Sequence, residues 1–139
     1  MRFLVCDGRV PDEARHIRQE VFVREQGFAE EFDTDDTRST HIVLFLQEQA
    51  VACCRFFVLD ELGAYKLGRI AVRKAYRGQN YGAALMQKAE EVLSSRGAKT
   101  LVIYAQAHAQ GFYERVGYTA KGELFLEEGV PHRRMEKQI

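Results

Sequence analysis

A change of hydrophobic period near the middle of the chain constrains the fold more than any other feature. Leu67–Val72 is a short apolar run interrupted by one glycine and one arginine, which is typical of a strand buried on at least one face. From Tyr81 onward the apolar residues recur at helical spacing, at Tyr81, Leu85, Met86, Ala89, Val92 and Leu93. The sequence therefore predicts a strand, a loop over 73–80 and a helix.

The loop has the composition of an anion site. Backbone N–H groups at the positive end of a helix dipole can bind phosphate, and glycine at 78 and 82 lets a ligand approach the backbone. Asn80 can adopt the left-handed conformation, and Arg77 adds a cation. The loop matches neither the dinucleotide nor the P-loop fingerprint, so a purely structural turn is the alternative.

The remaining periodicity predicts an α/β protein with a mixed sheet, in the order β-α-β-β-β-α-β-α-β-β. We expect a first helix from Pro11 to Gly27 and an acidic loop over Phe28–Thr40 that includes Glu30 and Glu31. The turn of the first hairpin is expected at Gln47–Ala50. The strands are expected at 3–6, 41–46, 51–59, 67–72, 101–104, from 118 and at 131–137, and the later helices at 81–96 and 109–115.

Composition narrows the function classes. A chain of 139 residues with 46% apolar content is expected to form one globular domain, spanning 1–139. A formal net charge of zero does not suggest nucleic acid or a membrane surface as a partner. No apolar run has membrane-spanning length, and no signal peptide is evident. Three cysteines favour reduced thiols, so we expect a cytoplasmic protein.

Four ordered segments carry a family resemblance. Arg77-Gly78-Gln79-Asn80-Tyr81-Gly82 resembles motif A of the GNAT superfamily of N-acyltransferases, Arg/Gln-x-x-Gly-x-Gly/Ala, with Asn80 in place of the first glycine. Tyr104–Tyr118 resembles motif B of that family. The tail Glu127–Met135 and the early Val21–Gln26 are similar to the small bacterial ElaA/YjcF-like branch. The resemblance covers nearly the whole chain.

The resemblance implies the GNAT acyl-CoA N-acyltransferase fold, acetyl-CoA as co-substrate and no metal. It implies that the loop amides bind the pyrophosphate of coenzyme A and that the preceding strand bonds its pantetheine arm. The acceptor would be a small-molecule or peptide amine, and the family also allows a homodimer. The implied cofactor-binding residues are Ile70, Ala71, Val72, Arg77, Gly78, Gln79, Asn80, Tyr81, Gly82, Ala83, Gln106, Ala109 and Phe112.

Acyl transfer from a thioester to an amine needs a base and stabilisation of the departing thiolate. The resemblance places Tyr113 near the sulfur, with Phe112 expected in the core and Tyr113 on the wet side. Two residues contend as base. His132 could remove a proton near neutral pH without special tuning, and it matches a histidine that some relatives use. Glu25 could accept a proton from, or simply bind, a cationic amine.

Two further alternatives stay open from the residues alone. Cys53 and Cys54 could suggest a nucleophile, but consecutive strand residues point to opposite faces, and we expect both in the core. The enzyme hypothesis is an acetyltransferase that acts by direct attack of a primary amine. The rival hypothesis is a binding module that senses acyl-CoA without turnover, because a fold alone does not fix function.

Overall fold

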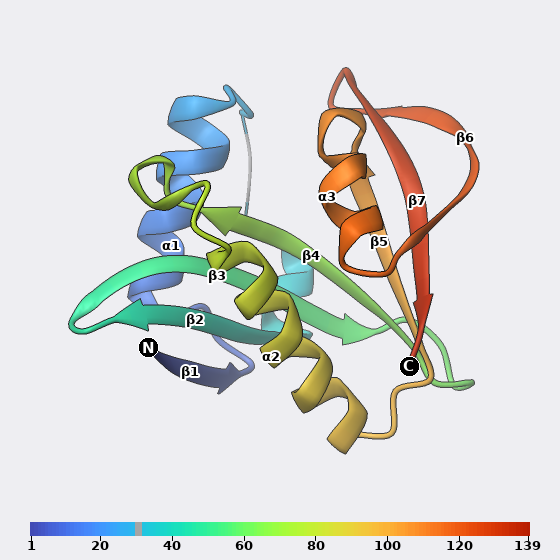
Figure 1. Ribbon diagram of the computed structural model, residues 1–139, viewed down its shortest axis with the longest axis horizontal. Helices are drawn as coiled ribbons and strands as arrows, with labels where there is room; N and C mark the ends of the chain where they lie inside the picture. Colours follow the sequence, from blue (N-terminus) through green and yellow to red (C-terminus); the bar gives the residue numbers. More distant parts are fainter. Residues whose placement is uncertain (30–31) are drawn as a thin grey trace.

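The computed structural model of the protein describes residues 1–29 and 32–139, so Glu30 and Glu31 lie outside the described residues. The predicted order of strands and long helices is confirmed, with four short turns of 3₁₀ or wider helix added (Figure 1). The elements are β1 (Arg2–Asp7), α1 (Asp12–Arg18), η1 (Gln19–Glu25), η2 (Thr34–Arg38), β2 (Thr40–Leu46), β3 (Gln49–Val58), β4 (Ala64–Val72), η3 (Lys74–Tyr76), α2 (Tyr81–Ser95), β5 (Thr100–Gln106), η4 (Ala107–Ala109), α3 (Gln110–Arg115), β6 (Thr119–Glu127) and β7 (Val130–Gln138).

Three predicted boundaries were wrong for reasons of pairing and capping. The first hairpin turns at 47–48, because Gln49 pairs with Leu46 and extends β3. β4 begins at Ala64 rather than Leu67, because its first residues also pair with β3 and with β5. The expected loop over 28–40 contains the 3₁₀ helix η2, which Asp33 caps by accepting a hydrogen bond from the Asp35 amide.

The strands form one seven-stranded sheet in the order β1-β2-β3-β4-β5-β7-β6. All neighbours are antiparallel except β4 and β5, which run parallel and pair only from Ala64–Lys66 to Thr100–Val102. Beyond these three pairs β4 stays with β3, and β5 stays with β7 along its whole length. The two strands therefore separate toward their carboxyl ends, as Figure 1 shows.

A β-bulge in β4 accompanies this separation. The register with β3 places Cys53 opposite Ala71 but Arg55 opposite Gly68, so two residues of β4 face one residue of β3. Arg69 adopts a positive φ of 49° within the bulge, which an L-residue rarely does. Because a bulge bends and twists its strand, it directs the end of β4 away from β5.

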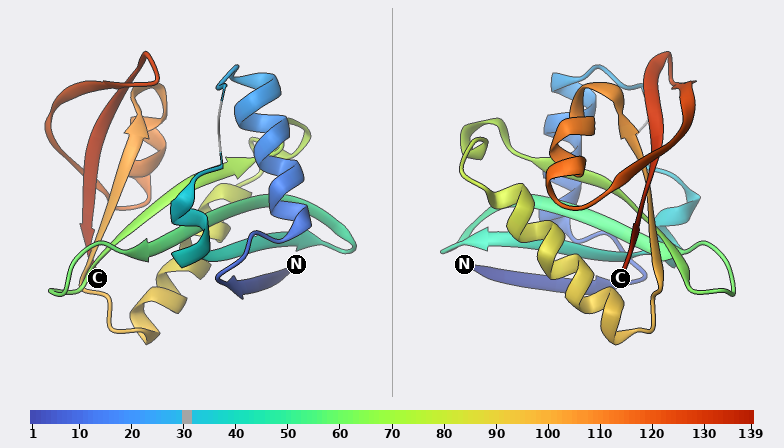
Figure 2. Two further views of the ribbon diagram at one scale, coloured as in Figure 1. Left: turned by 180° about the vertical axis from the view of Figure 1, so that it is seen from behind. Right: turned by 45° about the vertical axis from the view of Figure 1, so that its right-hand side comes forward.

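Helices cover both faces of the sheet, and each face has its own core. The helix formed by α1 and η1 packs on one face, with Ile17 and Val21 against Val43. α2 packs on the other face through residues such as Leu85, Met86, Ala89 and Leu93 (Figure 2). Cys53 belongs to the first core and Cys54 to the second, and both are buried, as predicted. No helix within residues 1–29 and 32–139 is long and apolar enough to cross a membrane.

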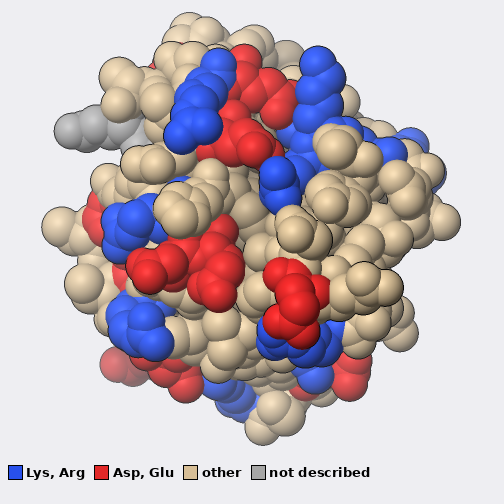
Figure 3. Space-filling view, turned by 90° about the vertical axis from the view of Figure 1, so that its left-hand side faces the viewer, with Lys and Arg blue, Asp and Glu red and all other residues tan. Residues whose placement is uncertain are grey.

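A buried ion-pair network ties η2 to both the sheet and α1. The Asp36 carboxylate accepts two hydrogen bonds from the guanidinium of Arg18 and one from Arg55 at 2.8 Å. Arg55 also donates to both carboxylate oxygens of Asp33, which accepts a further hydrogen bond from Arg69 at 3.0 Å. On the surface, charges of both signs are interspersed at the end of the molecule shown in Figure 3.

The Asp36 carboxylate is essential to this network. Burial opposes its ionisation, but Arg18 and Arg55 outweigh burial and lower the pKa of Asp36 from 3.8 to about 2. A lowered carboxyl pKa contributes stability above the pKa of the unfolded chain, and the protein loses that stability as the pH falls toward 2.

We predict that Asp36→Asn lowers the free energy of unfolding in urea at pH 7 by about 3–5 kcal/mol, because two buried guanidinium groups lose a charged partner. The matched control is Asp35→Asn, whose ion pair with Arg38 is half exposed, and it should cost less than about 1 kcal/mol. The difference between wild type and Asp36→Asn should also narrow between pH 3.8 and 2. Equal losses in the two variants would contradict the network's role.

Candidate functional site

The separation of β4 and β5 opens a cleft of about 1160 Å³. Its walls include β4 from Lys66 to Val72 and β5 from Ile103 to Gln106. The inner edges of both strands lack a strand partner there. Unpaired N–H and C=O groups in the middle of a sheet need another partner, so the cleft can receive an extended, hydrogen-bonding ligand between the strands.

One end of the cleft is formed by the loop before α2. Gly78 and Asn80 both have positive φ, 79° and 66°, so the predicted left-handed conformation of Asn80 is confirmed. The Asn80 side chain does not cap α2, and the backbone hydrogen bonds of the helix begin with the Ala84 amide, which donates to the Asn80 carbonyl at 3.1 Å. The first amides of α2 are therefore available to an anion at the positive end of a 15-residue helix.

Gly82 permits close packing of α3 against the start of α2. A β-carbon at position 82 would lie 3.2 Å from Cζ and 3.3 Å from Cε1 of Phe112, and 3.6 Å from Cγ2 of Val72. A larger residue would therefore displace the Phe112 ring, which forms part of the cleft wall. The packing of the Phe112 ring therefore already requires glycine at position 82, before any requirement that a ligand adds.

The prediction that Phe112 packs in the core and Tyr113 lies on the wet side was wrong, because the two roles are exchanged. Tyr113 is 8% exposed and belongs to the core, whereas Phe112 is only half-buried, because consecutive helix residues point in directions about 100° apart. Tyr113 nevertheless lines the cleft, with its ring 5.1 Å from that of Phe112 and 6.1 Å from that of Tyr118. Burial raises the pKa of the Tyr113 phenol, so it stays protonated at neutral pH.

His132 lies on β7, opposite Gln106 of β5, lines the cleft and is 5% exposed. Its Nδ1 is 2.7 Å from the carbonyl oxygen of Val130. Because a carbonyl only accepts, Nδ1 must carry a proton, and Nε2 is the basic nitrogen of the neutral ring. Nε2 lies 3.4 Å from a carboxylate oxygen of Glu127, which becomes an ion-pair partner once the ring is protonated.

The structure brings two predicted site residues together in an unexpected way. The guanidinium of Arg77 donates to both carboxylate oxygens of Glu25, at 2.5 and 2.8 Å, and its Nε donates to the carbonyl of Val72 at 2.8 Å. The hydrogen bonds from Arg77 lower the pKa of Glu25. Glu25 is thus a weaker base than a solvated glutamate, and Arg77 has a carboxylate partner at the end of the cleft.

Of the other predicted site residues, all line the cleft except Gln79, which is exposed beside it. Gln106 donates a hydrogen bond to the side chain of Gln26 at 2.9 Å and lies 2.7 Å from His108, so its amide bridges the two sides of the cleft. The residues that share the cleft wall are Ile70, Ala71, Val72, Gly78, Asn80, Tyr81, Gly82, Ala83, Gln106, Ala109 and Phe112. Among the described residues, no group of histidine, cysteine or acidic side chains could hold a metal ion.

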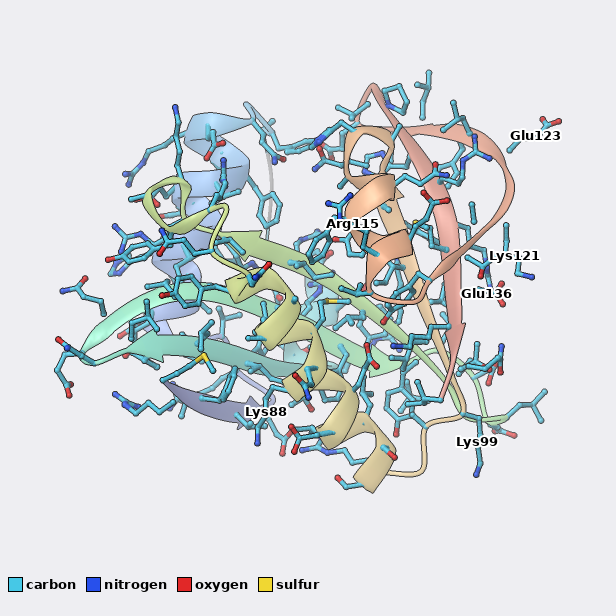
Figure 4. The ribbon with its side chains drawn as sticks, in the orientation of Figure 1. Lys88, Lys99, Arg115, Lys121, Glu123 and Glu136 are labelled. Atoms are coloured by element: carbon cyan, nitrogen blue, oxygen red, sulfur yellow. The ribbon has the colours of Figure 1, made fainter. Side chains whose placement is uncertain are left out.

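Sequence reasoning missed two basic residues of the cleft, Lys66 and Arg115. Arg115 lies within motif B, at the end of α3, on the side toward β4 (Figure 4). Lys66 was left out because the predicted strand began at Leu67. Alternation along a strand would have found it, since Lys66 and Gly68 point to the same face.

The sequence and the fold of this chain are similar to those of known proteins. Residues 10–139 match the family described as acetyltransferase (GNAT) domain. The chain is 37% identical over 128 residues to the uncharacterized N-acetyltransferase YjcF of Bacillus subtilis (strain 168), covering 90% of each chain. The crystal structure of Escherichia coli ElaA superimposes with a TM-score of 0.87 at 29% identity and 98% coverage of both chains. An aminoglycoside 6'-N-acetyltransferase complexed with coenzyme A shares the fold, with a TM-score of 0.76 at 15% identity over 99% and 97% of the chains.

Proposed function

The chain belongs to the GNAT acetyltransferase family, and we propose that it transfers an acetyl group from acetyl-CoA to a primary amine by direct attack. The observation that carries this proposal is the shape of the cleft. Two strands with open inner edges lead to a loop whose helix amides are uncapped by side chains. A ligand with an amide-containing arm and a diphosphate fits both features.

Each part of the donor has a suitable partner. The amides at the start of α2, with Gly78 and Asn80 setting the loop, suit the diphosphate. Arg115 is a further cation at that end, because its helix α3 packs Phe112 on Gly82. The open edge of β4 over Ile70–Val72 suits the amides of the pantetheine arm and the thioester carbonyl.

The reaction joins the acceptor nitrogen to the acetyl carbon and breaks the carbon–sulfur bond. The amine nitrogen gives up its proton to a base, and the electron pair leaves on the sulfur of coenzyme A. His132 is the stronger candidate for the base, because Nε2 is its basic nitrogen and Glu127 stabilises the imidazolium. Glu25 is the weaker candidate, since Arg77 holds it ionised and hydrogen-bonded.

Tyr113 would act on the leaving thiolate as a hydrogen-bond donor. Burial raises the pKa of its phenol above 10, and a thiol such as that of cysteine has a pKa of about 8.5. Complete proton transfer from the phenol to the thiolate is therefore uphill. A donated hydrogen bond stabilises the sulfur anion without that cost.

The first experiment tests turnover itself. We expect free thiol to appear from acetyl-CoA only when a primary amine is present. His132→Gln should reduce this release by roughly 10²–10⁴-fold, the usual contribution of a positioned base. His16→Gln is the matched control, because His16 is exposed on α1 outside the cleft, and it should behave like wild type. Coenzyme binding without any amine-dependent release would instead support an acyl-CoA sensor.

Tyr113→Phe tests the thiolate donor. Turnover should fall about 10²–10³-fold, as on removal of one donor to a developing anion, while the Michaelis constant for acetyl-CoA changes little. Tyr118→Phe is the matched control, because the Tyr118 hydroxyl is buried without a hydrogen-bond partner among the described residues, and its removal should leave turnover unchanged. Near-normal turnover of Tyr113→Phe would show that water or another group, and not Tyr113, stabilises the leaving thiolate.

The Glu25–Arg77 pair is tested by coenzyme A affinity in calorimetry. Glu25→Gln removes a negative charge beside the phosphate end and frees the guanidinium, so coenzyme A should bind more tightly. Arg77→Met should weaken binding, and each change should be about 2- to 10-fold for a partly exposed pair. If both variants weaken coenzyme A binding equally, the ion pair only stabilises the structure of the site, and Arg77 does not contact the phosphates.

A further inference from the structure

Most charges of the cleft are paired with one another. Among the described residues, the carboxylates pair as Glu25 with Arg77, Asp33 with Arg55 and Arg69, and Asp35 with Arg38, while Glu127 lies beside His132. Glu128 is exposed at the turn between β6 and β7. Two cations of the cleft, Lys66 and Arg115, form no ion pair with a described residue.

These two cations mark opposite ends of the cleft. Arg115 lies on α3, whose Phe112 contacts the start of α2 at the phosphate end. Lys66 lies where β4 and β5 still pair, at the point from which they separate. From Lys66 to Val72 a strand extends about 20 Å. Lys66 is therefore beyond the reach of the coenzyme's phosphates, and its charge faces the part of the cleft left for the acceptor.

A chain of ring contacts connects Lys66 to the candidate base, His132. Its Nζ lies 3.9 Å from the centroid of the Tyr104 ring. The Tyr104 ring meets Phe125 edge-on at 5.4 Å, and Phe125 stacks on His132 at 5.9 Å. Lys66, Tyr104, Phe125 and His132 thus form one continuous wall, which we call the acceptor wall.

The ammonium of Lys66 has lost part of its water without gaining an ion-pair partner among residues 1–29 and 32–139. Burial lowers the pKa of Lys66, and the Tyr104 face replaces only part of the lost solvation. Glu127 attracts the ammonium electrostatically, but no ion pair joins these two described residues. An anionic group of a ligand would restore the missing interaction.

We propose that Lys66 binds the carboxylate of the acceptor, and that the acceptor is an amino acid, an amine that carries a carboxylate several bonds from its nitrogen. This inference rests on the proposed acetyltransferase function. The acceptor wall presents a cation at Lys66 and, beside His132, the anion Glu127. A zwitterion matches this arrangement of charges, with its carboxylate at Lys66 and its ammonium near Glu127. The ammonium then loses its proton to Nε2 of His132. A diamine would place its second ammonium against Lys66, where like charges repel.

The experiment compares ω-amino acids with alkylamines of matched length. Glycine, β-alanine, 4-aminobutanoate and 6-aminohexanoate are paired with ethylamine, propylamine, butylamine and hexylamine, and thiol release from acetyl-CoA gives kcat/KM for each. The readout is kcat/KM for the amino acid divided by kcat/KM for the alkylamine of matched length, taken within each variant. A general loss of activity changes both values equally and so leaves this ratio unchanged. At one or more lengths this ratio should be roughly 10- to 100-fold in wild type, as for a hydrogen bond to a charged group.

Three variants test the residue. Lys66→Met should bring the ratio close to one, and Lys66→Arg should retain most of the preference because it keeps a cation. Lys121→Met is the matched control: Lys121 is exposed on β6, outside the cleft (Figure 4), and its removal should leave the ratio unchanged.

Two results would overturn the proposal while leaving the proposed function intact. One is a preference for the alkylamine at every length, and the other is a ratio that Lys66→Met does not change. In both cases alkylamine-dependent thiol release would still show an acetyltransferase. Absence of thiol release with every amine, despite coenzyme A binding, would instead refute the acetyltransferase function and this inference with it.

Discussion

The open inner edges of β4 and β5 are the constraint on which the rest of the structure depends. Backbone N–H and C=O groups in the middle of a sheet must be hydrogen-bonded, yet these strands share only three paired positions. The bulge at Arg69 bends β4 with β3, while β7 holds β5 along its whole length. The backbone groups of each half of the sheet are therefore hydrogen-bonded within that half. The unpaired N–H and C=O groups of β4 and β5 are concentrated in one cleft.

The charges around the cleft are organised by the same separation. Arg69 lies in the bulge and donates to Asp33, which is held by the buried Arg55, and Asp36 joins Arg55 to Arg18 on α1. The ion-pair network that stabilises the fold at Arg18 of α1 thus extends to Arg69 of β4, which lines the cleft. The carboxylates of this network are already paired with arginines, and Lys66 and Arg115 are cations of the cleft that form no ion pair with a described residue.

Burial assigns roles to residues that sequence alone ranks as equals. His132 and Tyr113 are both nearly inaccessible, but His132 presents Nε2 beside Glu127, whereas Tyr113 keeps its proton because burial raises the pKa of its phenol. Glu25 is ionised and paired with Arg77. The candidate base therefore comes from β7 and the candidate thiolate donor from α3, two elements beside β5.

The sequence by itself determined the order of the elements, the strand–loop–helix unit with left-handed Asn80 and the family motifs, because hydrophobic period and turn chemistry are local properties. It also placed Cys53 and Cys54 on opposite faces, since alternation along a strand is local as well. Only the tertiary structure decided that Glu25 meets Arg77, that Tyr113 rather than Phe112 is buried, and that Lys66 lies on the acceptor wall. Those contacts join residues far apart in the chain, and they follow from how β4 and β5 separate, which no local pattern encodes.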